Sequence, residues 1–235
     1  AIDSRVECLA PVVFDIVNMG PQMKHQVATF GATSQEIAEY NDRGIAQVSS
    51  PIGERLASIV DPFSYRASLA QPKLIILATN DGNSPLDALN LYWDSLIGEK
   101  YILYLPNNTH EIKDFPRIAG TVGALHRRVR GELTLPKLAW SFDERPESLR
   151  LRFTSDVAPD KVLLWTTASK SRDFRKSVWR STPVEAVDGA YRLETARPAT
   201  GFAAMFAEAQ FPDSLLPYFL SSNVRIVAAK EAPAK

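Results

Sequence analysis

The sequence predicts an α/β unit over residues 1–135, followed by a small antiparallel β-sandwich over residues 136–235. Two short apolar runs, at residues 73–79 and 100–105, enclose an amphipathic segment. This is the pattern of two parallel strands joined by a right-handed crossover. After residue 135 the pattern changes to short alternating segments separated by Pro, Asp, Gly and Ser, which is typical of an antiparallel sandwich.

The composition excludes several classes of function. The 27 Lys and Arg residues balance 27 Asp and Glu residues, so the chain lacks the basic excess that a nucleic-acid surface shows. No apolar run has the length of a membrane span. The single cysteine, Cys8, excludes an internal disulfide, and the three histidines have no metal-binding spacing. We therefore expect no nucleic-acid partner, no transmembrane segment, no metal and no cofactor.

The first unit combines three apolar strands with helices of moderate length. Ser50 and Pro51 mark the start of one helix, and Asp61 and Pro62 mark its end. In the last predicted helix, at 115–129, each of two glycines costs about 1 kcal/mol of helix stability relative to Ala. In chain order, we expect a buried strand at 5–14, a cap-like insertion at 15–66 with helices at 34–40 and 51–61, a strand at 73–79, a helix at 86–96, a strand at 100–105 and a helix at 115–129.

The second unit reads as a sandwich of immunoglobulin or fibronectin type, because its segments are short and alternating. Three of the four tryptophans, Trp140, Trp165 and Trp179, fall in this half, and we favour a core role for them over a carbohydrate platform. The seven predicted strands are 137–142, 148–153, 161–167, 184–187, 190–194, 202–209 and 223–227.

Two residues suited to proton chemistry follow the two parallel strands. Asp81 comes after the first strand and His110 after the second. Parallel strands end at the same rim of a sheet, where open α/β sheets bind ligands, so the two side chains should lie together. An acid followed by a histidine is the back half of a Ser–Asp–His triad in the chain order of α/β-hydrolases. No GxSxG-like serine motif occurs in the 235 residues.

Other readings of these polar residues remain open. Asp81 precedes Gly82, and Asp-Gly is a common turn dipeptide. Asp87 is a rival acid, although its place in the first turn of a predicted helix favours a role at the helix dipole. We expect His25 to be a solvated loop histidine and His126 to be structural. The charged segment 171–175 is a candidate for salt bridges to the first unit.

Several strings of the chain resemble the C-terminal half of the PhoPQ-activated pathogenicity-related family of α/β-hydrolase-like proteins. They are IDSRVECLAPVVFDIVNM at 2–19, VDPFSYRASLAQPKLIILATND at 60–81, LDALNLYWDSLIGEKYILYLPNNTH at 86–110, VLLWTTASKSRDFRKSVW at 162–179 and ATGFAAMFAE at 199–208. The resemblance implies the C-terminal half of an α/β-hydrolase parallel sheet followed by a β-sandwich. It also implies that Asp81 is the triad acid and His110 the triad histidine. The family's nucleophile is expected in a GxSxxG-like motif upstream of this chain.

We therefore expect a serine hydrolase that cleaves ester or amide bonds by acyl transfer, with Asp81 and His110 as its catalytic acid and base. The alternative is a non-catalytic, hydrolase-like protein that binds a partner. The expected partners are the N-terminal portion of the same hydrolase, needed to complete residues 1–135, and a small ester, amide or peptide substrate. The family resemblance further implies export to the periplasm or the exterior.

Overall fold

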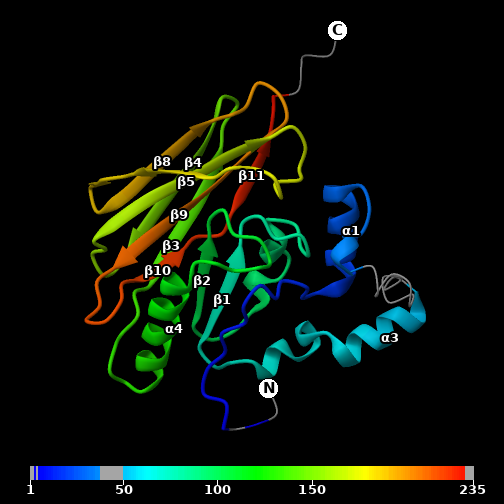
Figure 1. Ribbon diagram of the computed structural model, residues 1–235, viewed down its shortest axis with the longest axis horizontal. Helices are drawn as coiled ribbons and strands as arrows, with labels where there is room; N and C mark the ends of the chain where they lie inside the picture. The colour runs from blue at the N-terminus through cyan, green and yellow to red at the C-terminus, as the bar shows by residue number, and fades with distance from the viewer. Residues whose placement is uncertain (1–2, 4, 38–49, 231–235) are drawn as a thin grey trace.

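The computed structural model describes residues 3, 5–37 and 50–230 of the chain. A two-stranded parallel sheet, β1 (Lys73–Ala78) and β2 (Lys100–Leu105), lies between two larger antiparallel sheets on one side and the helices α1 and α3 on the other (Figure 1). Both strands of the pair agree with the predicted ones to within a residue. Each is an apolar run that follows a lysine; β1 is buried along its whole length and β2 over its last four residues.

The predicted α/β-hydrolase sheet is wrong. In the described residues, parallel pairing is limited to β1 with β2 and to two isolated bridges, Leu9 with Lys73 and Val12 with Ile76. The run at 5–14, predicted as a strand, follows β1 through these bridges without forming one. Pro11 has no N–H to donate, and Val13 has a φ of 45°, which interrupts an extended backbone. The described structure is mainly antiparallel β-sheet.

The helix predicted at 86–96 is also wrong. Two short 3₁₀ turns, η3 (Ala88–Leu91) and η4 (Trp93–Ser95), stand in its place. A 3₁₀ turn repeats every three residues, so Leu86, Leu89 and Tyr92 fall on one face. All three are buried in the same apolar cluster as β1 and β2. Burial of these large side chains therefore selects the tighter turn over the α-helix.

Three helices build the rest of the first unit. The helix α1 (Met19–Phe30) was not predicted, because Gly20 and Pro21 in its first turn are residues typical of loops. The helix α3 (Pro51–Val60) begins after Ser50, whose side chain accepts from Gly53 N, and is followed by the 3₁₀ helix η2 (Pro62–Ser68). A 3₁₀ turn, η1 (Gln35–Ile37), occupies the start of the helix predicted at 34–40, whose remainder lies outside the described residues. The helix α4 (Phe115–Val129) has the predicted bounds.

The second half forms two antiparallel sheets. One has the order β10-β9-β5-β6, with β11 also paired to β9, and the other has the order β3-β4-β8-β7. The strands are β3 (Leu138–Glu144), β4 (Ser148–Ser155), β5 (Lys161–Ser169), β6 (Arg180–Pro183), β7 (Ala186–Val187), β8 (Ala190–Ala196), β9 (Phe202–Phe211), β10 (Tyr218–Ser221) and β11 (Arg225–Ala228). The sequence pattern missed β6 and β10, which are only four residues long.

The apolar core is continuous between the two halves. One buried cluster joins Leu74 and Leu103 of the parallel pair to Leu151 and Phe153 of β4. As expected, the three tryptophans of this half belong to the packed interior: Trp179 is buried, and Trp140 and Trp165 are half-buried against the second cluster. The parallel pair β1 and β2 therefore packs against the antiparallel sheets through a shared apolar core.

Candidate functional site

The loops after β1 and β2 bring Asp81 and His110 together. Nδ1 of His110 lies 3.2 Å from each carboxylate oxygen of Asp81. The Asp81 side chain is 9% exposed and that of His110 is 49% exposed. The predicted proximity is confirmed, and it follows from the parallel direction of the two strands. The pair consists of a shielded carboxylate and an imidazole that reaches solvent.

Asn83 completes the immediate surroundings of the pair. Its backbone N–H donates to Oδ1 of Asp81 at 2.8 Å, which fixes the carboxylate in an Asx-type turn. Its side-chain Nδ2 lies 3.3 Å from Nε2 of His110. The turn reading of Asp81 and the acid reading are thus compatible, because one carboxylate serves both. Sequence reasoning did not identify Asn83, since a polar residue in a turn gives no distinguishing signal.

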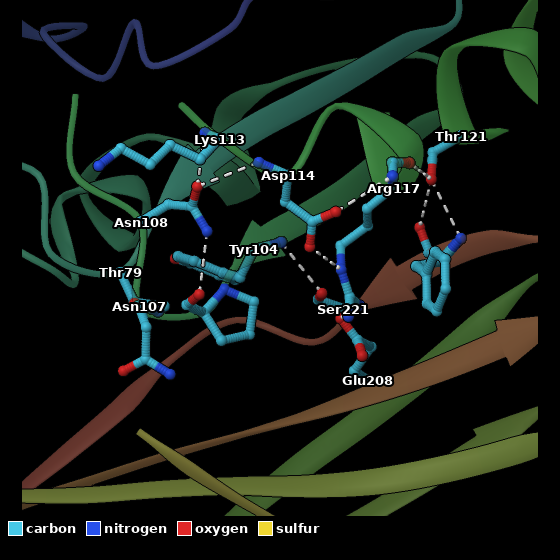
Figure 2. Close-up of polar contacts among 12 residues, drawn as sticks. Thr79, Tyr104, Asn107, Asn108, Lys113, Asp114, Arg117, Thr121, Glu208 and Ser221 are labelled. Carbon is cyan, nitrogen blue, oxygen red and sulfur yellow. Dashed lines mark hydrogen bonds and ion pairs between the residues drawn. The ribbon is translucent and has the colours of Figure 1, made fainter. Parts of the chain in front are cut away.

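The loop that carries His110 is closed on itself and fixed to α4 (Figure 2). Oδ1 of Asn108 accepts from the backbone N–H groups of Lys113 and Asp114, at 2.9 and 3.3 Å. Asp114 in turn accepts from Arg117 N at the start of α4 and from Arg117 Nε at 2.9 Å. Arg117 also pairs with the buried Glu208 of β9. Residues 108–114 are therefore connected, through Arg117, to the antiparallel sheet that contains β9.

The base of both loops is tied to the segment between β5 and β6. The backbone N–H of Asn107 donates to Oγ1 of Thr79 at 2.9 Å, which joins the ends of β1 and β2. Asn80 donates its side-chain amide to three backbone carbonyls of residues 174, 175 and 177. Asn107 and Trp179 exchange two hydrogen bonds, at 2.8 and 3.1 Å. These asparagines set the direction in which the two loops leave the strands.

The helix α1 supports the loop of Asp81 from the opposite side. Buried Gln26 donates to the carbonyl of Asn83 at 2.9 Å and accepts from Ser34 N at 3.0 Å. The Ser34 hydroxyl donates to the carbonyl of Gly82 at 2.5 Å. The turn at residues 81–83 is thus fastened to a helix that sequence reasoning missed.

A second histidine–carboxylate pair lies beside this turn. Nε2 of His25, on α1, is 2.7 Å from Oδ1 of Asp87, and Arg172 Nη2 is 2.5 Å from the other oxygen of Asp87. The expectations of a solvated His25 and of a dipole role for Asp87 are wrong, because both side chains are largely shielded and paired. Burial raises the pKa of Asp87, but His25 and Arg172 outweigh it and hold that pKa below its usual value. The salt bridge expected from segment 171–175 is confirmed at Arg172.

A buried acid, Asp15, lies further under α1. Its Oδ1 accepts from the Tyr92 hydroxyl at 2.7 Å, and burial raises the pKa of Asp15 well above its usual value despite that bond. The same burial raises the pKa of Tyr92. Its position directly after the apolar run VVF is the only signal of it in the sequence. We assign Asp15 no role in proton transfer to solvent, because its side chain is enclosed.

A groove of the described structure lies away from the pair. It has a volume of about 900 Å³ and lies between β2 and β3, with Tyr101, Trp140 and Asn223 among its lining residues. Neither Asp81 nor His110 lines it.

The described ranges contain no group of three or more His, Cys, Asp or Glu side chains placed to hold a metal ion. No helix within them has the length and apolar character needed to cross a membrane. His126 lies on α4 with its side chain exposed.

Comparison with known proteins gives a family and one curated relative. The family model described as "PhoPQ-activated pathogenicity-related protein" matches residues 1–175. Autocrine proliferation repressor protein A of Dictyostelium discoideum is 27% identical over 235 aligned positions, which cover 89% of this chain and 48% of that protein. This chain thus spans about half the length of the curated relative.

The solved structures that match do so at a low level. A carbohydrate-binding module family 56 β-1,3-glucan-binding domain covers 39% of this chain and 98% of its own, at 10% identity and a TM-score of 0.27. A Br derivative of a family 56 module has a TM-score of 0.29 at 7% identity, with 41% of this chain and 96% of that chain covered. At these scores the likeness carries no argument about the site.

Proposed function

The chain belongs to the PhoPQ-activated pathogenicity-related protein family, and we propose that it supplies the acid and base of a serine hydrolase that cleaves ester or amide bonds. The observation that carries the proposal is the Asp81–His110 pair, with the imidazole held through Nδ1 at 3.2 Å from both carboxylate oxygens. Membership of the family leaves the substrate open.

The environment of the pair suits these two roles. A carboxylate can only accept hydrogen bonds, so Asp81 favours the tautomer of His110 that carries its proton on Nδ1. The lone pair then lies on Nε2, the nitrogen that a general base needs. Shielding keeps Asp81 in place, while the greater exposure of His110 gives a substrate access to its ring.

The reaction proposed for this pair is acyl transfer. Nε2 of His110 takes the proton of a serine hydroxyl as its oxygen attacks the substrate carbonyl. Asp81 stabilises the imidazolium that forms, and His110 then gives the proton to the leaving alcohol or amine. The 235 residues hold no GxSxG-like motif, so we propose that the serine comes from a segment outside them.

The neighbouring His25–Asp87 pair fits this chemistry less well. Both oxygens of Asp87 are engaged, one by His25 and the other by Arg172. The His25 side chain is mostly shielded, and its Nε2 faces the carboxylate. This pair therefore cross-links α1, the loop after β1 and the segment before β6, instead of offering a base to a substrate.

The test is labelling of the full-length protein with a fluorophosphonate probe, which captures an activated serine. We expect labelling of the unaltered protein and a loss of about a thousandfold or more in the rate for His110→Ala. His126→Ala is the matched control, because it removes an exposed histidine on α4, and it should label at the unaltered rate.

Equal labelling of His110→Ala and the unaltered protein would exclude His110 as the base. A folded full-length protein that no probe labels would contradict the hydrolase proposal and favour the non-catalytic binding alternative.

A further inference from the structure

We propose that the side chain of Asn83 holds the His110 base in a resting state by occupying its Nε2 lone pair. The two groups lie 3.3 Å apart, and Asn83 is in the turn that also positions Asp81. The catalytic meaning of this contact rests on the proposed function. The contact itself can be tested without it.

The direction of the hydrogen bond follows from the partners of the imidazole. Nδ1 faces two carboxylate oxygens, which can only accept, so Nδ1 carries the ring proton. In a neutral ring Nε2 is then the acceptor. The side chain of Asn83 must therefore present its amide N–H to Nε2. This matches the placement of Nδ2, and not the amide oxygen, toward the ring.

A neutral Nε2 has one lone pair, so it cannot accept from Asn83 and from a nucleophile hydroxyl at once. A serine that uses His110 has to displace the amide of Asn83. The displacement needs only a rotation of that side chain, because the backbone of Asn83 is held separately. Its N–H is bonded to Asp81 and its carbonyl to Gln26, which is buried in α1. The dyad thus stays assembled while its base nitrogen is exchanged between two donors.

Asn83 is therefore a positioning residue that acts through His110. Its amide keeps the imidazole in the tautomer that catalysis requires, and it shields Nε2 until a better donor arrives. Substitutions of Asn83 keep its backbone N–H, so they remove the amide without removing the backbone bond to Asp81.

The experiment measures carbethoxylation of His110 by diethyl pyrocarbonate in the full-length protein, with the modified peptide quantified by mass spectrometry. The reagent acylates a ring nitrogen through its free lone pair: the N–C bond forms and ethyl carbonate leaves. Three forms are compared, namely the unaltered protein, Asn83→Leu and Asn83→Ala. Leucine has the same number and branching of side-chain heavy atoms as asparagine but cannot donate, so it covers the ring at least as well and removes the hydrogen bond. Exposed His126, in the same sample, is the internal reference for reagent and pH.

We expect His110 to react about twofold to tenfold faster in Asn83→Leu, the range that corresponds to loss of one hydrogen bond. His126 should react at one rate in all forms. An unchanged His110 rate in Asn83→Leu would overturn the proposal. A faster rate in Asn83→Ala alone would overturn it as well, because that result assigns the effect to shielding.

Fluorophosphonate labelling of the same three forms and of His110→Ala separates this inference from the proposed function. Faster carbethoxylation in Asn83→Leu without labelling of any form supports the role of Asn83 and contradicts the hydrolase. Labelling that depends on His110, with unchanged carbethoxylation, supports the hydrolase and contradicts the role of Asn83.

Discussion

At the scale of single residues, the position of one proton decides what His110 can do. Asp81 accepts from Nδ1 and so leaves Nε2 as the basic nitrogen. The backbone N–H of Asn83 and the enclosure of Asp81 keep this carboxylate from rotating. A change at Asp81 should therefore act on the tautomer of His110 more than on the fold.

Asp81→Asn is the corresponding prediction. The amide that replaces the carboxylate can donate to Nδ1, which moves the ring proton to Nε2 and removes the base. We expect hydrolysis of an activated ester by the full-length protein to fall by about 10⁴-fold. The measurement is the steady-state rate with p-nitrophenyl acetate.

Asp188→Asn is the matched control for this change, since Asp188 is exposed in a turn with φ of 50°, which asparagine also tolerates. That variant should keep the unaltered rate. Retention of full activity by Asp81→Asn would exclude Asp81 as the triad acid.

At the scale of elements, α4 shows that packing decides how a glycine affects the stability of a helix. Gly120 and Gly123 both weaken the helix by intrinsic propensity. Their surroundings differ, however. A Cβ at Gly120 would lie 2.2 Å from the carbonyl oxygen of Pro217, whereas a Cβ at Gly123 would meet nothing within 4 Å. Gly120 is thus needed for the close approach of α4 to the segment before β10.

Two alanine substitutions test this difference. Gly120→Ala should lower the free energy of unfolding by about 1–3 kcal/mol, because backbone has to move to admit the methyl group. Gly123→Ala should raise it by about 0.5–1 kcal/mol, the ordinary gain of alanine in an exposed helix position. Guanidinium unfolding of the two variants and the unaltered protein measures both. Equal effects of the same sign would contradict the close packing of α4 at Gly120.

At the scale of the whole molecule, polar side chains link parts that are distant in sequence. Asp87 joins α1 through His25 and the segment before β6 through Arg172. Asn80 and Asn107 join the ends of the parallel strands to the same segment. Together with the shared apolar core, these contacts explain why the loops that carry Asp81 and His110 have fixed directions.

The ion pairs of Asp87 should make the free energy of unfolding depend on pH. The folded-state pKa of Asp87 lies below its usual value, so ionised Asp87 stabilises the fold above the unfolded pKa, at about 3.9. That stabilisation is lost as the pH falls through the lower, folded-state pKa. Asp87→Asn should lower the free energy of unfolding by about 1.5–3 kcal/mol at pH 7, and the difference should shrink below about pH 4.

Guanidinium unfolding at pH 7, 5, 4 and 3 measures this difference. Asp143→Asn, which removes an exposed pair with Arg145, is the control and should change stability by less than about 1 kcal/mol. A difference between Asp87→Asn and the unaltered protein that is the same at pH 7 and pH 3 would contradict the assignment.

The sequence by itself determined the local elements and the meeting of the dyad. The short apolar runs became β1 and β2, whose apolar residues are largely buried, and α4 has the bounds that its pattern predicts. Asp81 and His110 lie together because any two parallel strands end at the same rim. These features depend on hydrophobic periodicity and strand direction, both of which can be read from a single sequence.

Only the tertiary structure decided what surrounds these elements. The prediction of a larger parallel sheet was wrong because Pro11 and Val13 interrupt the pairing of residues 5–14. The prediction of a helix at 86–96 was wrong because 3₁₀ turns bury Leu89 and Tyr92 there. His25 and Asn83 acquired their partners from segments 62 and 27 residues away. Such contacts depend on how elements pack in space, and a local pattern carries no information about a partner so distant along the chain.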